Sequence, residues 1–370
     1  MSRRCRVSRT LIFSVSLLLL TETPACLEGY RPLQSGHLLR LNERGEPTLD
    51  TTFVVEPVQF EIEGFRISGW LYLPKTEGPH PLAVLTNGGG DNVRAVRSFS
   101  DFIAPGLSHC GVAALVHDKR GTGDSEGVFR ETDYEDYIAD AGNAGILLAQ
   151  DPRFDPSRIA VAGASEGGRV AVLAASRYPT FRFVISYAGP VIDMLEHRLL
   201  AQFEHLRTVN ATPEERRLAE PVMREELEAW RSGDPEANRR VDRKIVELRR
   251  TLRRSVLPAT RAEMLSGSFD HLLPTWNSLH YDFVTEMERF RKPWLAIFGA
   301  HDGIVPPEVH IREIGRTTGL SGNPDVTVAV IPRSGHAPVD LETHQRVHLE
   351  GLILPWLSER GIGGSAPNED

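Results

Sequence analysis

One serine of the chain stands in a sequence context that can make it a nucleophile. Gly163, Ser165 and Gly167 form a G-x-S-x-G motif, which the apolar run RIAVA precedes and the helical pattern RVAVLAASRY follows. A sharp strand-to-helix turn at such a motif holds the serine hydroxyl clear of a sheet, and small residues leave room for neighbouring backbone. The alternative is a tightly packed glycine turn without chemistry. The context favours Ser165 as a nucleophile.

A serine hydroxyl is a weak nucleophile at neutral pH and needs a general base. With this motif the expected chain order is Ser, acid, His. His336 is the candidate base, because it follows the apolar run VTVAVI in Ser-Gly-His-Ala-Pro. Asp302, after the run PWLAIFG, is the candidate acid that would accept the Nδ1–H of His336 and fix its tautomer. Asp-Gly is also a common turn dipeptide, and Asp340 is the second choice for the acid.

Backbone amides beside the serine could stabilise the oxyanion of an acyl-transfer reaction. The run LAVLT leads into Asn-Gly-Gly-Gly-Asp-Asn at 87–92, where glycines let main-chain N–H groups turn toward such a charge. We expect the donors to be the N–H groups of Gly89 and of Glu166, the residue after the nucleophile, with Gly88 as the alternative to Gly89. This role uses the main chain alone and requires nothing of the Glu166 side chain.

The elements that must position these residues alternate between strands and helices. Near-continuous apolar runs are typical of strands buried on both faces, and their alternation with helical patterns predicts a mostly parallel, doubly wound α/β sheet. An antiparallel hairpin is expected at 52–62 and 65–73. Further strands are expected at 82–86, 112–117, 158–162, 182–188, 293–299 and 326–331, and helices at 95–109, 132–150, 166–177 and 342–358.

Residues 191–290 interrupt this alternation with consecutive, highly charged helical patterns punctuated by proline. Such an insertion would lie over the carboxyl ends of the strands, where open α/β sheets bind ligands, so we predict a helical cap there. The expected domains are therefore a core at 50–190 and 291–360, the cap at 191–290 and a flexible tail at 361–370.

The first 25 residues have the parts of a secretory signal, namely several arginines, an apolar run at 11–20 and a small-residue end. The run is too short to span a bilayer, and a buried N-terminal helix is the alternative. We expect an exported protein of the periplasm, cell envelope or extracellular space, with membrane attachment through the N-terminus or a lipidated Cys26 as an option. Cys110 lies in a helical pattern, so no structural disulfide is expected.

The composition excludes several classes of protein. Of 370 residues, 41% are hydrophobic and 25% charged, which excludes a largely disordered or collagen-like chain. A net charge of −8 argues against a non-specific nucleic-acid binder. His344 and His348 could share a face of the last helix, but no Cys or carboxylate cluster accompanies them. We therefore expect no metal and no organic cofactor.

Together these segments resemble the α/β-hydrolase superfamily over residues 52–358. The resemblance rests on NGGGDN at 87–92, GASEGG at 163–168, FGAHDGIVP at 298–306 and SGHAP at 334–338. Residues 117–127 (HDKRGTGDSEG) are similar to the DKRG-x-G-x-S-x-G loop of bacterial serine esterases and of prolyl-oligopeptidase-like or dienelactone-hydrolase-like relatives. The resemblance implies the α/β-hydrolase fold with an inserted cap and carboxylic-ester hydrolysis. We expect Asp118 and Arg120 of this loop to form an ion pair.

These observations predict a serine esterase that cleaves a small-molecule carboxylic ester through an acyl-enzyme. Ser165 would attack, His336 would transfer the proton, and Asp302 would orient His336. Two alternatives stay open, a peptidase or amidase with the same triad and a catalytically silent hydrolase fold that acts as a binding module. The sequence does not indicate the oligomeric state or the acyl and alcohol groups of the substrate.

Overall fold

The computed structural model of the protein describes residues 30–32, 38–41, 47–49, 52–91, 98–252, 256–257 and 281–362. The expected signal peptide, Cys26 and most of the expected tail lie outside these ranges, as do residues 258–280 of the expected cap. Within the described ranges, no helix is both long enough and apolar enough to cross a membrane.

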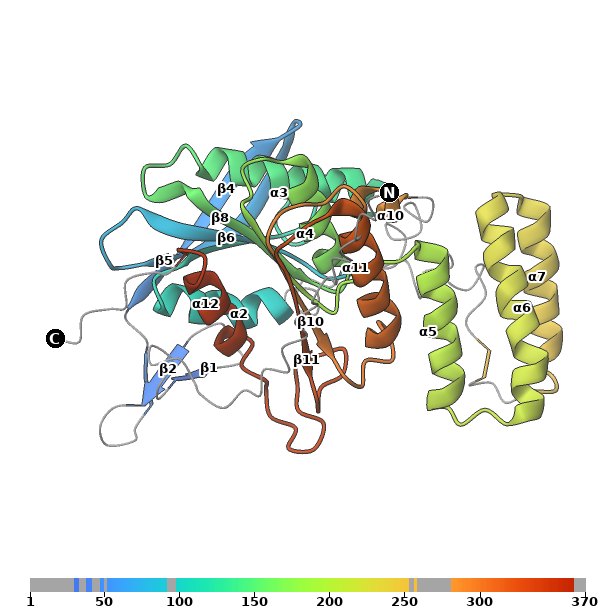
Figure 1. Ribbon diagram of the computed structural model, residues 1–370. Coiled ribbons are helices and arrows are strands. Elements are labelled where there is room, and N and C mark those ends of the chain that lie inside the picture. The colour runs from blue at the N-terminus through green and yellow to red at the C-terminus, as the bar shows by residue number, and fades with distance from the viewer. Residues whose placement is uncertain are drawn as a thin grey trace, which may run out of the picture.

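The centre of the molecule is an eight-stranded sheet with the order β11-β10-β9-β8-β6-β7-β5-β4 (Figure 1). Strands β4 and β5 form the expected antiparallel hairpin, β5 also pairs antiparallel with β7, and the other neighbours are parallel. The predicted fold class is confirmed. The strands are β4 (Phe53–Ile62), β5 (Phe65–Pro74), β6 (His80–Thr86), β7 (Ala113–His117), β8 (Phe154–Ala164), β9 (Phe183–Tyr187), β10 (Trp294–Gly299) and β11 (Val326–Ile331).

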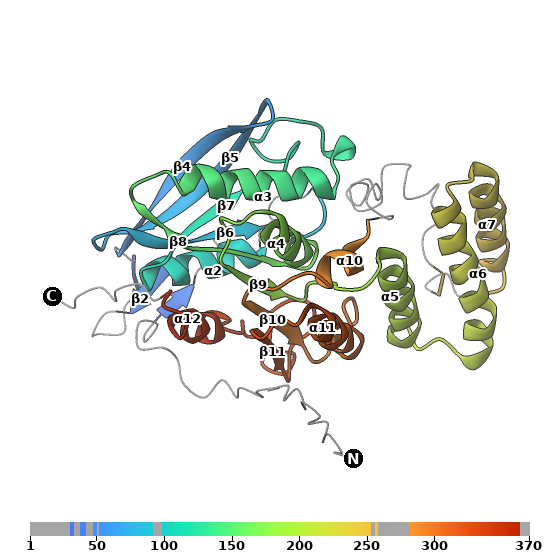
Figure 2. The same ribbon diagram turned by 45° about the horizontal axis from the view of Figure 1, so that its top comes forward.

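Helices cover both faces of this sheet, which explains why its inner strands are mostly apolar. Successive side chains of a strand point to opposite faces, and in β6 Leu82 and Val84 enter one core while Ala83 and Leu85 enter the other. One core includes α3 (Tyr134–Leu148), α4 (Glu166–Arg177), α10 (Phe283–Met287) and α11 (Pro307–Ser321), and the other includes α2 (Ser98–His109) and α12 (Glu350–Ser358). Figure 2 shows the sheet between these layers.

The chain before the hairpin adds a small sheet that the sequence analysis did not predict. Its antiparallel strands are β1 (Tyr30–Pro32), β2 (Leu38–Leu41) and β3 (Pro47–Leu49). These segments are too short and too irregular for an alternating pattern to stand out.

The last helix begins at Glu350, later than the predicted start at 342. Asp340 accepts hydrogen bonds from the amides of Glu342 and Thr343, both at 2.9 Å, and so holds this segment in a turn. His344 has a left-handed backbone, with φ of 56°. His344 and His348 therefore do not share a helical face, and the considered metal pair is not formed.

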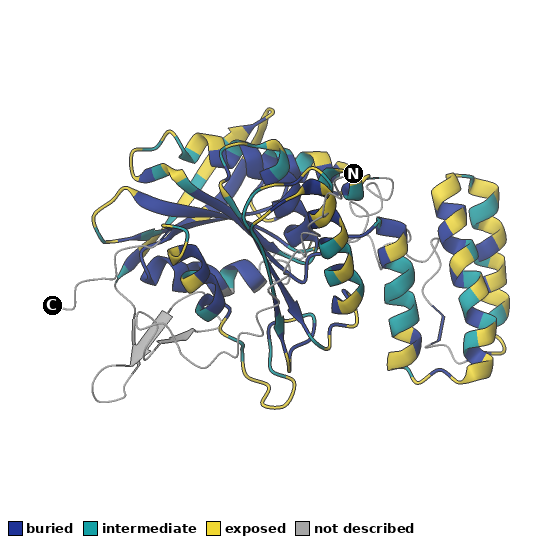
Figure 3. Ribbon diagram, viewed as in Figure 1, coloured by how far each residue is buried: buried dark blue, intermediate teal, exposed yellow. Residues whose placement is uncertain are grey.

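The region 191–290 contains α5 (Met194–Thr208), α6 (Pro213–Ser232) and α7 (Pro235–Leu248). These helices have a hydrophobic core of their own, in which Leu206, Met223, Val241 and Ile245 are buried. Figures 1 and 2 both show α5 next to the α/β core, and the α6–α7 pair farther from it. The outer faces of α6 and α7 are exposed (Figure 3), which accounts for the many charged residues of this segment.

Cys110, which directly follows α2, is disulfide-bonded. The expectation of no structural disulfide is therefore wrong. The helical pattern around Cys110 predicts an unpaired cysteine. In the structure Cys110 is buried and lies just after the last residue of α2, outside the helix. The other two cysteines, Cys5 and Cys26, both lie outside the described residues.

Candidate active site

Ser165 occupies a sharp turn between β8 and α4. Its φ of 54° and ψ of −126° are strained for a residue with a side chain. A Cβ at Gly163 would lie 2.2 Å from Thr86 Oγ1, and one at Gly167 would lie 2.4 Å from the Thr86 carbonyl oxygen. Only glycine therefore fits at these two positions, and the close backbone packing supports the strained serine.

The structure brings the three expected side chains together at the carboxyl end of the sheet. His336 Nε2 lies 3.0 Å from Ser165 Oγ, and His336 Nδ1 lies 2.9 Å from Asp302 Oδ2. The Asp302 side chain is fully buried, whereas that of His336 is 27% exposed. Since a carboxylate only accepts hydrogen bonds, Nδ1 carries the proton and Nε2 offers its lone pair to the serine hydroxyl.

Asp302 is held in one orientation by its own backbone surroundings. Its second oxygen, Oδ1, accepts hydrogen bonds from the amides of Ile304 and Val305, both at 2.8 Å. Oδ2 is therefore left to face His336. Asp340, the second choice for the acid, instead pairs with Arg333 at 2.8 Å and accepts the turn amides described above.

The loop that carries His336 is fixed by Tyr187, a residue that the sequence analysis missed. The Tyr187 hydroxyl donates to the Gly335 carbonyl at 2.9 Å and lies 3.2 Å from Ser334 Oγ. Burial raises the pKa of Tyr187, which keeps the phenol neutral and able to donate. Its position at the end of β9 is the one sequence signal that could have indicated it.

The two expected oxyanion donors are neighbours in the structure. Glu166 is the first residue of α4, so its N–H belongs to the turn at the positive end of the helix dipole. A Cβ at Gly89 would lie 3.6 Å from Glu166 Oε2, which places the glycine turn against this residue. Buried Asn87 fixes the turn, because its Oδ1 accepts from Ser100 Oγ at 3.0 Å. The donor roles of Gly89 and Glu166 stay predictions.

Comparison with known proteins agrees with this arrangement. Residues 78–256 match the model of a family described as serine aminopeptidase, S33. The fold is that of the Pyrococcus furiosus esterase Pf2001 (TM-score 0.51, 17% identity, 84% of this chain and 89% of that one) and of the α/β-hydrolase GrgF from Penicillium (TM-score 0.51, 17% identity, 83% and 98%). The chain therefore has the α/β-hydrolase fold.

Curated relatives match the chain over shorter segments. The thiohydrolase aneE of Aspergillus aculeatus is 32% identical over 133 residues, which are 36% of this chain and 40% of the relative. The quorum-quenching protein AidA of Acinetobacter baumannii is 36% identical over 115 residues, or 30% of this chain and 36% of that protein. The chain thus spans about two fifths of the length of the curated relatives it matches.

The DKRG loop, residues 117–127, is held by an ion network that differs from the expected pair. Arg120 is buried and binds Asp140, Asp136 and Glu63, with N–O distances of 2.7 to 2.9 Å. Asp118 instead lies inside the loop, where a Cβ at Gly123 would be 2.2 Å from its Oδ2. The expected Asp118–Arg120 pair is therefore wrong, because three carboxylates on neighbouring elements surround the guanidinium.

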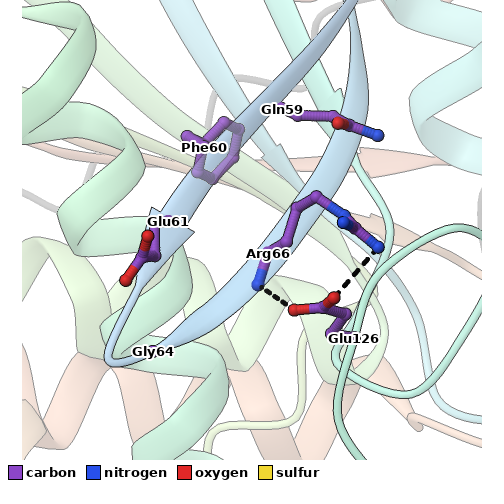
Figure 4. A pocket seen from close by; sticks show the side chains of 6 residues that line it. All are labelled: Gln59, Phe60, Glu61, Gly64, Arg66 and Glu126. Atoms are coloured by element: carbon purple, nitrogen blue, oxygen red, sulfur yellow. Dashed lines mark hydrogen bonds and ion pairs between the residues drawn. The ribbon is translucent and has the colours of Figure 1, made fainter.

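A surface hollow at the β4–β5 hairpin is unrelated to the triad. Arg66 binds Glu126 there through both its amide and its guanidinium, each at 2.9 Å, and so fastens the hairpin to the DKRG loop (Figure 4). None of the residues that line this hollow belongs to the candidate site. In the described part of the chain, no group of three or more His, Cys, Asp or Glu side chains could hold a metal ion.

Proposed function

We propose that this hydrolase is a serine esterase that cleaves a small-molecule carboxylic ester through an acyl-enzyme. The observation that carries the proposal is the unbroken chain of hydrogen bonds from Ser165 Oγ through His336 to the buried carboxylate of Asp302. A neutral imidazole in this tautomer can take the serine proton, and Asp302 then stabilises the imidazolium that forms.

The reaction would proceed in two balanced steps. Ser165 Oγ attacks the acyl carbon while His336 Nε2 takes the hydroxyl proton, and the oxyanion forms near the N–H groups of Gly89 and Glu166. Collapse of this intermediate breaks the bond to the alcohol, which leaves with the proton from Nε2. Water then attacks the acyl-enzyme and gives a proton to Nε2. The bond between the acyl carbon and Ser165 Oγ breaks, Nε2 returns the proton to Oγ, and the acid is released.

Two other acyl substrates have specific support. The family description names an aminopeptidase, which favours an amide, and the name of the relative aneE favours a thioester. One enzyme preparation should be assayed with a p-nitrophenyl ester, the matching thioester and the matching aminoacyl anilide. We expect kcat/KM for the ester to exceed that for the anilide by at least a hundredfold. Equal or faster anilide turnover would contradict the esterase and favour the peptidase.

We also propose that residues 191–290 form a cap that limits access to Ser165. The chain enters this region through residues that Arg169 fixes, since its Nε donates to the Pro190 carbonyl at 3.0 Å and its Nη2 to the Ile192 carbonyl at 2.8 Å. Arg169 is completely buried, and its guanidinium lies 4.9 Å from the Phe283 ring centre. Because Arg169 is one helical turn after Ser165, the base of the cap is tied to the nucleophile helix.

We further propose that the protein is exported. The Cys110 disulfide supports this, because disulfides persist mainly in oxidising compartments. If residues 1–25 are removed, Cys26 is the remaining partner of Cys110 in the chain, and a lipid on the Cys26 thiol would then exclude the disulfide.

Peptide mapping of the exported protein without reduction tests this proposal. We expect a peptide that joins Cys26 to Cys110, and its loss after reduction is the control. A free Cys110 thiol together with an intact N-terminus would contradict export. A lipidated Cys26 would contradict the disulfide pairing alone.

A further inference from the structure

A buried ion pair lies beside the candidate oxyanion turn. Lys119 Nζ is 2.5 Å from Glu166 Oε1, and the two side chains are only 4% and 6% exposed. Lys119 Nζ also lies 4.6 Å from the centre of the Tyr137 ring. Burial of a charge without an opposite charge nearby is strongly unfavourable, so Lys119 and Glu166 stabilise one another in this position.

The topology of the sheet places this pair directly under the turn. Lys119 follows β7 and Glu166 follows β8, and β6 lies between these two strands in the sheet. All three strands are parallel, so their carboxyl ends share one edge. An ion pair between Lys119 and Glu166 must therefore cross the end of β6, from which the turn with Gly89 starts. The 3.6 Å between Glu166 Oε2 and a Cβ at Gly89 agrees with this crossing.

The pair puts a carboxylate next to the place where negative charge would develop. The same residue, Glu166, offers its N–H to the oxyanion and carries the carboxylate on its side chain. An unpaired carboxylate a few ångströms from an oxyanion in a water-poor site would raise the energy of the transition state. A neutral ester in the ground state would be affected far less.

We propose that Lys119 is a positioning residue of this site, which neutralises and holds the Glu166 carboxylate so that the oxyanion can form. This inference rests on the proposed esterase function. Both acylation and deacylation pass through an oxyanion, so loss of Lys119 slows both steps. Loss of Lys119 therefore lowers kcat and leaves KM nearly constant, because the negative charge of Glu166 raises the energy of the transition state more than that of the bound ester.

The test is a double-mutant cycle of Lys119→Met, Glu166→Gln and the combined variant, assayed with a p-nitrophenyl ester. Lys119→Met should lower kcat by about tenfold to a hundredfold with KM within about twofold of the wild type. Glu166→Gln breaks the same ion pair but removes the negative charge, so it should keep at least ten times the kcat of Lys119→Met. The combined variant should recover to the level of Glu166→Gln. Lys119→Arg, which keeps the charge, should retain more activity than Lys119→Met.

The sign of the charge separates this role from a structural one. If the pair only stabilised the fold, the two single variants would lose kcat in parallel with their thermal stability, and that result would overturn the proposal. Should Lys119→Met fail to fold, the comparison within the Glu166→Gln background decides. Removal of Lys119 there should change kcat by no more than about twofold, and a further tenfold loss would overturn the proposal.

Failure of the proposed function would be visible separately. Ester turnover by the wild type that did not depend on Ser165 would contradict the esterase itself. The kcat values of the double-mutant cycle are compared with that of a wild-type enzyme whose turnover is shown to require Ser165. If they do not follow the expected order, only the role of Lys119 is contradicted.

Discussion

We expect Ser165→Ala to abolish ester turnover and covalent labelling by a fluorophosphonate, and the wild type to take up one label per chain. The structure leads to this result because Ser165 Oγ is the atom that His336 Nε2 faces at 3.0 Å. Removal of a nucleophile from such a triad lowers kcat by about 10⁶. The measurements are steady-state kinetics and the mass of the labelled protein.

Ser125 supplies a matched control for this prediction. Gly123, Ser125 and Gly127 also fit G-x-S-x-G, so the motif occurs twice in the chain. Ser125 Oγ accepts from the Ser68 amide at 3.0 Å and donates to the Asp118 carbonyl at 2.9 Å, and no histidine among the described residues is hydrogen-bonded to it. Ser125→Ala should therefore keep its fluorophosphonate label. Persistent labelling of Ser165→Ala would show that another residue is the nucleophile.

The two copies of the motif show why sequence context carried the prediction of the site. Around Ser165 the pattern runs from a buried strand into a helix, and this order produces the half-buried, strained serine that the structure has. Ser125 lies in a loop that folds back on β5. A motif search without the flanking elements would not distinguish the two serines.

Most of the sheet could be predicted because its strands are buried on both faces. Strands β6, β7 and β10 are buried at every position and mostly apolar, so they stand out in the sequence. The helix α11 was not predicted, because its buried face is itself largely polar, with His310, Thr317, Thr318 and Ser321, and shows no apolar periodicity. The turn at Asp340 was missed because its side chain competes locally with a helix.

Contacts between residues far apart in the chain could not be predicted from the sequence. The order of residues in the superfamily indicates Ser165, Asp302 and His336, but nothing in a linear pattern brings Tyr187 to the loop of His336 or Lys119 to Glu166. Such pairs depend on which strands are neighbours in the sheet. Cys110 is a similar case, since its helical pattern does not show which segment its thiol meets.

Asp302→Asn should lower kcat by about 10⁴, the effect known for this substitution in a Ser-His-Asp triad. In this chain the reason can be traced to single atoms. The amides of Ile304 and Val305 both donate to Oδ1 of Asp302, so an asparagine must keep its oxygen there and turn its NH₂ group toward His336. His336 Nδ1 would then accept a hydrogen bond, and the proton would move to Nε2.

An imidazole protonated at Nε2 cannot take the proton of Ser165, so the substitution removes the base without removing a side chain. Asp340→Asn is the matched control, because Asp340 also accepts two backbone amides but pairs with Arg333. The amide of Thr343 holds the pKa of Asp340 at about 2, so its charge is constant near neutral pH. We expect Asp340→Asn to keep kcat within about threefold. If the two variants were equally stable to heat but Asp340→Asn had the lower kcat, Asp340 and not Asp302 would be the residue that orients His336.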